Sequence, residues 1–250
     1  MGDTSPIERV ESFLVEASAT SRRHDPDATR YLLAQAADAA AGIEDDRSRR
    51  FALSSIAQHA VNVFYPELAQ QLARQLIRLD RQLGCTSWVI TDVLSYGSSM
   101  HLSRQHLEAE EAFRQAFDLA LQIESWQQAS AASSNYAAAI AARGALEEAE
   151  GWLRRSLECL AREPDLDTEI RTRAMLIQIR HALGESPASC LDQARSLIDE
   201  RGAQMTDSHR GVLQAALEPV LASVFAANPE LDPPAWVEQH FPELMEERSG

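Results

Sequence analysis

The chain has 250 residues, of which 45% are apolar and 24% charged, so it can bury a core large enough to fold without disulfide or metal support. Acidic residues outnumber basic ones by 38 to 23, giving a formal net charge of -15. This excess argues against nucleic acid and anionic membrane surfaces as partners. All 23 basic residues are arginine, which excludes chemistry that depends on lysine, such as Schiff-base formation.

Three cysteines, Cys85, Cys159 and Cys190, stand far apart with no CxxC spacing, so neither a disulfide framework nor a zinc site is expected. The first residues lack the basic stretch and apolar core of a signal peptide, and no run of 18 apolar residues occurs. We therefore expect a cytoplasmic protein without metal or cofactor. Abundant arginine and alanine in place of lysine indicate a GC-rich, bacterial genome.

Apolar residues recur with the period of amphipathic helices along the whole chain, and strand-like alternation is nowhere sustained. Glycine and proline mark the ends of these segments. The pattern predicts an all-α protein with helices over residues 6–20, 26–42, 47–64, 66–83, 87–103, 106–124, 127–143, 146–163, 166–183, 187–202, 207–227 and 233–247. Pro66 and Pro187 fit first helical turns, whereas Pro219 lies inside a periodic segment and predicts a kink or split there.

A shift of 40 residues superimposes the central part of the chain on itself. In the second helix of each unit, aligned alanines are followed four residues later by Ala73, Phe113 and Leu153. In the first helix the aligned small residues are Ala57, Gly97 and Ala137. A small residue beside a large one lets two helices approach closely. Each unit is therefore expected to be an antiparallel helix hairpin that needs its neighbours to bury its apolar face.

The third of these helix hairpins, residues 130–160, resembles the tetratricopeptide repeat family. The residues that carry the likeness are Asn135, Tyr136, Ala137, Ile140, Gly144, Leu146, Ala149, Leu153, Ser156 and Leu157. The resemblance implies a right-handed superhelical solenoid of about six hairpins in a single domain over 1–250. Its clearest repeats are 50–83, 90–123 and 130–163, and 207–250 is expected to cap the C-terminal end. The spacing exceeds the family's roughly 34 residues, and glycine ends the first helix in only one of the three repeats.

In such solenoids the first helix of each hairpin lines the concave face. The repeat phase places Phe51 on this face, together with the candidate partner-binding residues Ser54, Gln58, Asn62, Leu94, Ser98, His101 and Ser134. Amide and hydroxyl groups suit the backbone of an extended or helical peptide, and the acidic balance favours a basic partner. The sequence thus predicts a non-enzymatic adaptor or scaffold that binds a protein or peptide segment.

Two other functions stay open. An enzyme or small-molecule sensor would use Asp92, Tyr96, His101 and Asn135 around a concave cavity as acid, base and orienting groups. A structural protein would instead assemble as a homodimer through its terminal hairpins. A deep pocket with converging polar groups would favour the first, and a large apolar patch on one end would favour the second.

Histidine and aspartate patterns are not expected to bind metal. His101 and His106 stand five residues apart, about 140° around a helix that is expected to end between them. Asp25 and Asp165 directly precede predicted helix starts, and Asp45 and Asp46 precede the helix predicted from residue 47. At such positions a carboxylate accepts hydrogen bonds from free backbone N–H groups. We expect these aspartates to be helix caps.

Overall fold

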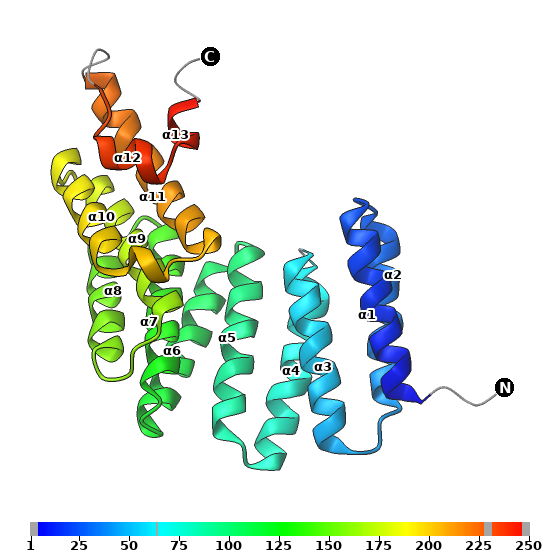
Figure 1. Ribbon diagram of the computed structural model, residues 1–250. Coiled ribbons are helices and arrows are strands. Elements are labelled where there is room, and N and C mark those ends of the chain that lie inside the picture. The colour runs from blue at the N-terminus through cyan, green and yellow to red at the C-terminus, as the bar shows by residue number, and fades with distance from the viewer. Residues whose placement is uncertain (1–4, 64, 228–231, 247–250) are drawn as a thin grey trace. The chain divides into compact units, whose positions relative to one another are not determined.

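The structure is a computed structural model that describes residues 5–63, 65–227 and 232–246 (Figure 1). Within these ranges the chain contains no strand, and the predicted all-α class is confirmed. The first seven helices are α1 (Pro6–Arg22), α2 (Pro26–Ala41), α3 (Asp46–Asn62), α4 (Pro66–Leu83), α5 (Thr86–Leu102), α6 (His106–Gln122) and α7 (Trp126–Ala142). They are followed by α8 (Leu146–Leu160), α9 (Leu166–Ala182), α10 (Pro187–Arg201), the 3-10 helix η1 (Gly202–Gln204), α11 (Asp207–Ala227), α12 (Ala235–His240) and α13 (Glu243–Glu246). None of the helices described is both long and apolar enough to cross a membrane.

The helices begin where the sequence supplies caps. The side chain of Asp25 accepts a hydrogen bond from the backbone N–H of Ala28, and Asp45 accepts one from Ser48. Asp165 does the same for Thr168, so the expectation that these three aspartates cap helices is confirmed. Each capped N–H would otherwise lack a partner in the first helical turn.

Two predictions for the C-terminal helices are corrected. The sequence predicts a kink or split at Pro219. Helix α11 runs through this residue without a break, so the split is wrong and the kink stays a prediction. Proline removes the hydrogen bond to the carbonyl four residues earlier, and the Gln178 side chain of α9 replaces it by donating to the carbonyl of Ala215 at 3.2 Å. The helix predicted over 233–247 is instead α12 and α13, because Pro242 disfavours helical backbone at Phe241. Residue 247 lies outside the described ranges.

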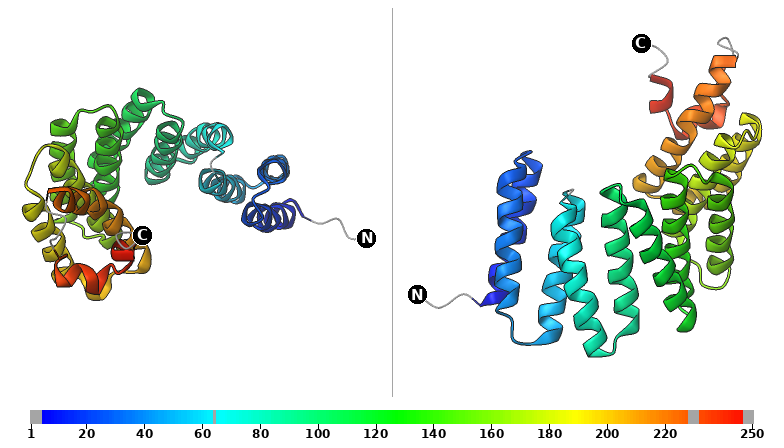
Figure 2. Two further views of the ribbon diagram at one scale, coloured as in Figure 1. Left: turned by 90° about the horizontal axis from the view of Figure 1, so that it is seen from above. Right: turned by 180° about the vertical axis from the view of Figure 1, so that it is seen from behind.

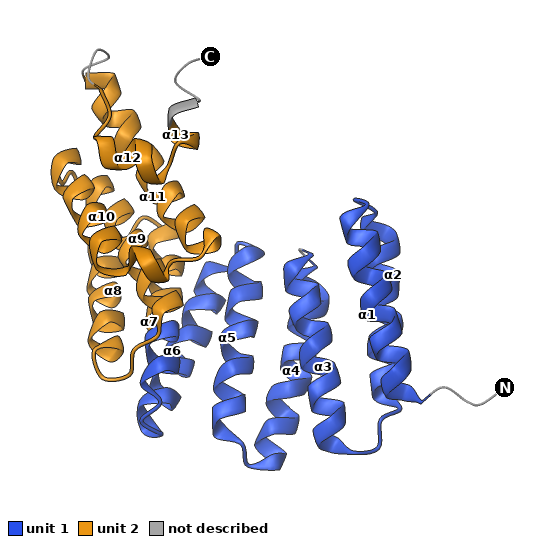
Figure 3. Ribbon diagram, viewed as in Figure 1, with its two compact units in different colours: residues 1–132 blue, residues 133–250 orange. Residues whose placement is uncertain are grey.

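The chain divides into two compact units, residues 1–132 and 133–250 (Figure 3). In unit 1 consecutive helices pair as α1/α2, α3/α4 and α5/α6, seen end-on in Figure 2. The first helices of these hairpins are neighbours, because α1 contacts α3 and α3 contacts α5. The core of the first two hairpins is apolar and includes Leu33, Ile56, Leu72 and Leu76.

Unit 2 has its own apolar core. Helix α9 packs against α8, α10 and α11, and its core side chains include Ile170, Ile177 and Leu217. Val237 and Phe241, in and just after α12, are buried in the same core. The single domain over 1–250 and the capping role of 207–250 stay predictions.

Within hairpins, left-handed turn residues recur at multiples of 40 residues. Turns between helices place residues in the left-handed region of φ, which glycine adopts without strain. Within hairpins these residues are His24 (φ 57°), Arg104 (φ 60°), Gly144 (φ 87°) and Gly184 (φ 91°), and between hairpins they are Gly84 (φ 70°) and Glu124 (φ 55°). Within hairpins the turn geometry therefore follows the 40-residue period even where the residue type does not, whereas between hairpins only Gly84 and Glu124 share it.

Candidate functional site

The predicted binding residues on α3 form a polar strip. Gln58 and Asn62 are exposed, whereas Ser54 is half-buried. The side-chain amide of Gln58 donates a hydrogen bond to the side-chain oxygen of Asn62 at 3.1 Å. This bond fixes both side chains and leaves the Gln58 oxygen as an acceptor and the Asn62 NH2 group as a donor. The pair thus offers the two complementary groups that a peptide backbone requires.

On α5 the predicted residues are less available. Leu94 and Ser98 are both half-buried, and the Ser98 hydroxyl donates to the carbonyl of Leu94 at 2.9 Å. The Ser98 oxygen can still accept a hydrogen bond, but its proton is used within the helix. A partner would therefore meet Ser98 as an acceptor.

Ser134 does not lie on a binding surface. Its side chain belongs to unit 2 and only 6% of it is exposed. The Thr172 hydroxyl of α9 donates to the Ser134 oxygen at 3.3 Å, and Ser156 of α8 lies 3.1 Å from the same threonine hydroxyl. The three hydroxyls form a small network in the interior. One position along a helix turns a side chain by about 100°, so the repeat phase was too coarse to distinguish a groove from this helix contact.

A groove lies between α1 and α3 on the side where these first helices meet, and we call it the first-helix groove. It encloses about 350 Å³ and is lined mainly by apolar side chains, among them Ile7, Val10, Leu14 and Phe51. Phe51 is 73% exposed. It precedes Gln58 and Asn62 by seven and eleven residues, which places all three on one face of α3. The apolar recess and the polar strip thus lie along the same face of α3.

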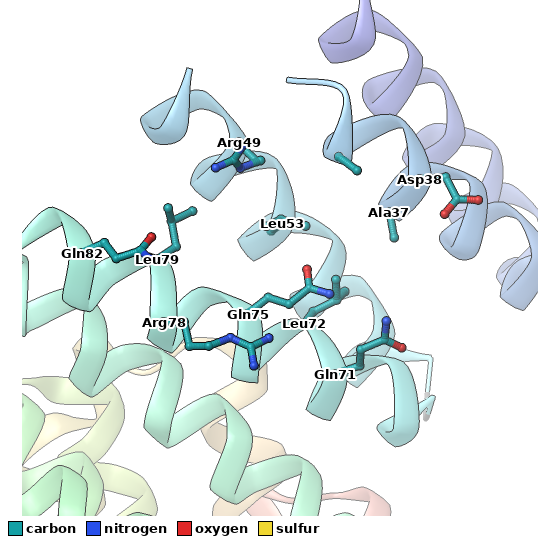
Figure 4. A pocket seen from close by; sticks show the side chains of 11 residues that line it. Ala37, Asp38, Arg49, Leu53, Gln71, Leu72, Gln75, Arg78, Leu79 and Gln82 are labelled. Atoms are coloured by element: carbon teal, nitrogen blue, oxygen red, sulfur yellow. The ribbon is translucent and has the colours of Figure 1, made fainter. Parts of the chain in front are cut away.

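A second and larger groove lies between α2 and α4, and we call it the second-helix groove (Figure 4). It encloses about 480 Å³. One wall is the row Gln71, Gln75, Arg78 and Gln82 of α4, and the other consists of Ala37, Asp38 and Ala41 of α2. Leu53, Leu72 and Leu79 also line it, together with Arg49. This groove lies outside the first-helix face on which the sequence predicts binding, although the spacing of three, four and seven residues in the α4 row is a sequence signal for it.

Asp92, a candidate acid or base, is instead part of a buried ion cluster. The Arg50 guanidinium donates to Asp80 at 3.2 Å and lies 3.5 Å from a carboxylate oxygen of Asp92. The Arg50 side chain also covers the ring of Trp88, 4.7 Å from its centre. Burial, reinforced by the hydrogen bond to Asp80, raises the pKa of Asp92 to about 8. Asp92 is therefore protonated at neutral pH.

His101 does not join Asp92. Its ring nitrogen Nδ1 lies 3.2 Å from Nδ1 of His106, and burial followed by the neighbouring His106 lowers the pKa of His101. The helix end predicted between the two histidines is confirmed, since α5 ends at Leu102 and α6 begins at His106. The turn between these helices brings the two rings together. Tyr96 lies under the Arg74 guanidinium, and among the described residues its side chain forms no hydrogen bond with Asp92 or His101. Asp92, Tyr96 and His101, three of the four groups proposed for an enzyme, are thus in three separate environments.

Metal binding would need a larger cluster than the histidine pair. Among the described residues, no three histidine, cysteine, aspartate or glutamate side chains lie close enough to hold an ion together. The three cysteines are free thiols.

Comparison with known proteins finds similarity in structure alone. No family model and no curated protein matches the sequence. Aspartyl phosphate phosphatase F from Bacillus subtilis aligns with a TM-score of 0.74 and 10% identity over 98% of this chain and 61% of its own. A STAND protein with a tetratricopeptide repeat sensor from Pyrococcus horikoshii aligns with a TM-score of 0.66 and 10% identity over 98% of this chain and 37% of its own.

A third structure supports the same fold. The TPR-like repeats of a kinesin light chain from Podosopora anserina align with a TM-score of 0.61 and 16% identity, covering 81% of this chain and all of theirs. At these identities the likeness concerns the fold. The resemblance predicted from residues 130–160 is confirmed: the chain has a tetratricopeptide-like fold of helix hairpins.

Proposed function

We propose that this chain, a helix-hairpin protein with the tetratricopeptide-like fold, is a non-enzymatic scaffold that binds a segment of a partner protein on the first-helix side of unit 1. The observation that carries the proposal is the first-helix groove, an apolar recess beside the exposed amides of α3. We place the protein in the cytoplasm, since its three thiols are free.

Phe51 supplies the apolar anchor. Its ring is 73% exposed, and the neighbouring α1 also exposes Ile7 and Val15. Burying a phenylalanine side chain contributes roughly 1.5–3 kcal/mol, so a partner that covers this ring gains a substantial share of its affinity. Exposed apolar side chains gathered around a groove are typical of interaction sites.

The polar strip sets the chemistry of the bound segment beyond the anchor. Gln58 and Asn62 lie about 10 and 16 Å along α3 from Phe51, at about 1.5 Å per residue. We expect a segment with one apolar side chain in the groove and free backbone amides or polar side chains over the strip. The net charge of -15 favours a basic segment, because complementary fields speed association.

The test is selection of binding peptides from a random displayed library on the purified full chain. We expect the selected peptides to share an apolar anchor and to bind at least tenfold more weakly to Phe51→Glu. The triple variant Gln58→Glu, Asn62→Glu, Ser98→Glu should also weaken binding. Tyr31→Glu is the matched control, since Tyr31 is an exposed aromatic residue of α2 (64%) that does not line the groove.

Two results would contradict the proposal. If folded Phe51→Glu and the triple variant bind the selected peptides as tightly as the wild type, this face is not the site. If sedimentation shows a homodimer that Phe51→Glu dissociates, the groove is occupied by a second copy of the chain. Circular dichroism of each variant establishes that it is folded.

A further inference from the structure

We infer that the second-helix groove of unit 1 is a separate binding site for an extended segment of a protein chain that carries an acidic side chain. The inference does not rest on the proposed function, because the two grooves have no lining residue in common. Three observations support it: the row of polar side chains on α4, the charged residues around that row, and the small residues of α2 that face it.

The α4 row presents hydrogen-bonding groups along one face of the helix. Gln71, Gln75, Arg78 and Gln82 are spaced four, three and four residues apart, which places them on one side of α4. In Figure 4, the side chains of Gln75 and Arg78 extend from α4 into the space between α4 and α2. Because the facing residues Ala37 and Ala41 are small, the groove stays open at the depth of a polypeptide backbone.

These groups are unused within the described part of the chain. None of the side-chain amides of Gln71, Gln75 and Gln82 has a protein hydrogen-bond partner among the described residues, and Arg78 forms no ion pair there. Arg49, the other cation of the groove, pairs with Asp46 and donates to the carbonyl of Ile43. Arg78 is therefore the available cation of the groove, and the three amides remain free to pair with a ligand.

The row is specific to this hairpin. Forty residues further on, the equivalent positions of α6 are Glu111, Gln115, Asp118 and Gln122. The repeat therefore keeps two glutamines but replaces Arg78 by an acidic residue. A solvent-facing position on an amphipathic helix is expected to be polar, but this expectation does not explain why Arg78 is positively charged.

The dimensions and chemistry fit an extended chain. From Gln71 to Gln82 the helix rises about 16 Å, which is the length of roughly five residues in extended conformation. Glutamine amides both donate and accept, as backbone peptide groups do, and a guanidinium binds a carboxylate in two parallel hydrogen bonds. Asp38 on the opposite wall repels a carboxylate, so the acidic side chain of the ligand should point toward α4. The volume of about 480 Å³ is within the range of ligand-binding clefts.

The test uses nuclear magnetic resonance of the isotopically labelled full chain with a blocked peptide, acetyl-Ala-Ala-Glu-Ala-Ala-amide. We expect it to shift the side-chain amide signals of Gln71, Gln75 and Gln82. A peptide with Gln in place of Glu should bind at least threefold more weakly, and one with Lys should not bind detectably. Arg78→Gln should abolish the preference for the Glu peptide, whereas Arg81→Gln, an exposed arginine of the same helix outside the groove, should retain it.

Three results would overturn the inference. Equal binding of the Glu and Gln peptides would remove the role of Arg78. Equal shifts with sodium acetate alone would reduce the site to a carboxylate contact without backbone recognition. Absence of shifts in the three glutamine signals would place any binding elsewhere. Phe51→Glu should leave the Glu peptide bound, so failure of one groove is distinguishable from failure of the other.

Discussion

Hairpins α5/α6 and α7/α8 are equivalent repeats, but the space between their two helices is filled by residues of different sizes. In α5 the position is Gly97, and a methyl group added there would lie 2.6 Å from the ring of Phe113 in α6. Forty residues on, the same two positions are Ala137 and Leu153, both completely buried. A larger residue on one helix is thus matched by a smaller one on the other. The repeat preserves the space between the helices, and the residues in it vary.

Charge is distributed unequally in the same way. Asp80 at the end of α4 and Asp92 in α5 form the buried cluster with Arg50, whereas the positions 40 residues on are Ala120 and Ala132. Both alanines are fully buried. Apolar residues are therefore sufficient at these two repeat positions. The ion cluster is a local addition whose stability depends on each member having its partner.

The largest expected effect is that of Asp80→Asn. Asp80 is completely buried and is the nearest carboxylate to Arg50, so its removal leaves a largely buried guanidinium without its main partner. We expect the free energy of unfolding in urea to fall by about 3 kcal/mol. Asp199→Asn, which removes an exposed ion pair with Arg195, is the control and should change it by less than about 0.5 kcal/mol. An equal effect of both variants would contradict the ion cluster.

The second prediction concerns pH. Because the pKa of Asp92 is raised to about 8 in the folded state, the folded protein holds a proton that the unfolded chain releases near pH 4. Stability should therefore fall as pH rises from about 4 to about 8, by at most about 1.4 kcal/mol per pH unit, and then level off. Asp92→Asn cannot ionise and should flatten this dependence. Urea unfolding at pH 5, 7 and 9 measures it, and an unchanged slope in the variant would refute the assignment.

The third prediction breaks the match between Gly97 and Phe113. Gly97→Ala should lower the free energy of unfolding by about 1–2 kcal/mol. The added methyl group clashes with the Phe113 ring, and the cost of this clash exceeds the gain in helix propensity from glycine to alanine. Adding Phe113→Leu reproduces the pairing of the next hairpin. We expect the double variant to be more stable than the sum of the single changes predicts, as measured in a double-mutant cycle. Strict additivity would show that the two positions do not share one space.

The smallest effect is expected at the hairpin turns. Arg104 and Gly144 hold the same left-handed turn position, with φ of 60° and 87°. Arg104→Gly relieves the strain of a side chain in this region but loosens the unfolded chain, so we expect a gain of about 0.5 kcal/mol. Gly144→Arg should lower the free energy of unfolding by at least the amount by which Arg104→Gly raises it. Thermal unfolding of both variants checks the opposite signs, and a loss of stability in Arg104→Gly would argue against a shared turn.

The helices were predictable because local chemistry decides them. The caps at Asp25, Asp45 and Asp165 stand where the structure has them, and the central boundaries agree within a few residues. The exception after residue 233 has a local cause too, since Pro242 was present in the sequence. The binding residues were less accessible to prediction. Gln58 and Asn62 are exposed as expected, whereas Ser134 is buried.

Composition and the 40-residue period by themselves determined the helical class, the hairpin order and the resemblance to tetratricopeptide repeats, because backbone hydrogen bonding and apolar periodicity are local properties of the chain. Only the tertiary structure decided which polar groups meet. It brought Asp80, Asp92 and Arg50 together from three helices, turned His101 toward His106, and left the amides of α4 facing open space. Such contacts depend on the rotation and spacing of neighbouring helices, and a rotation of one residue step is enough to exchange a buried side chain for an exposed one.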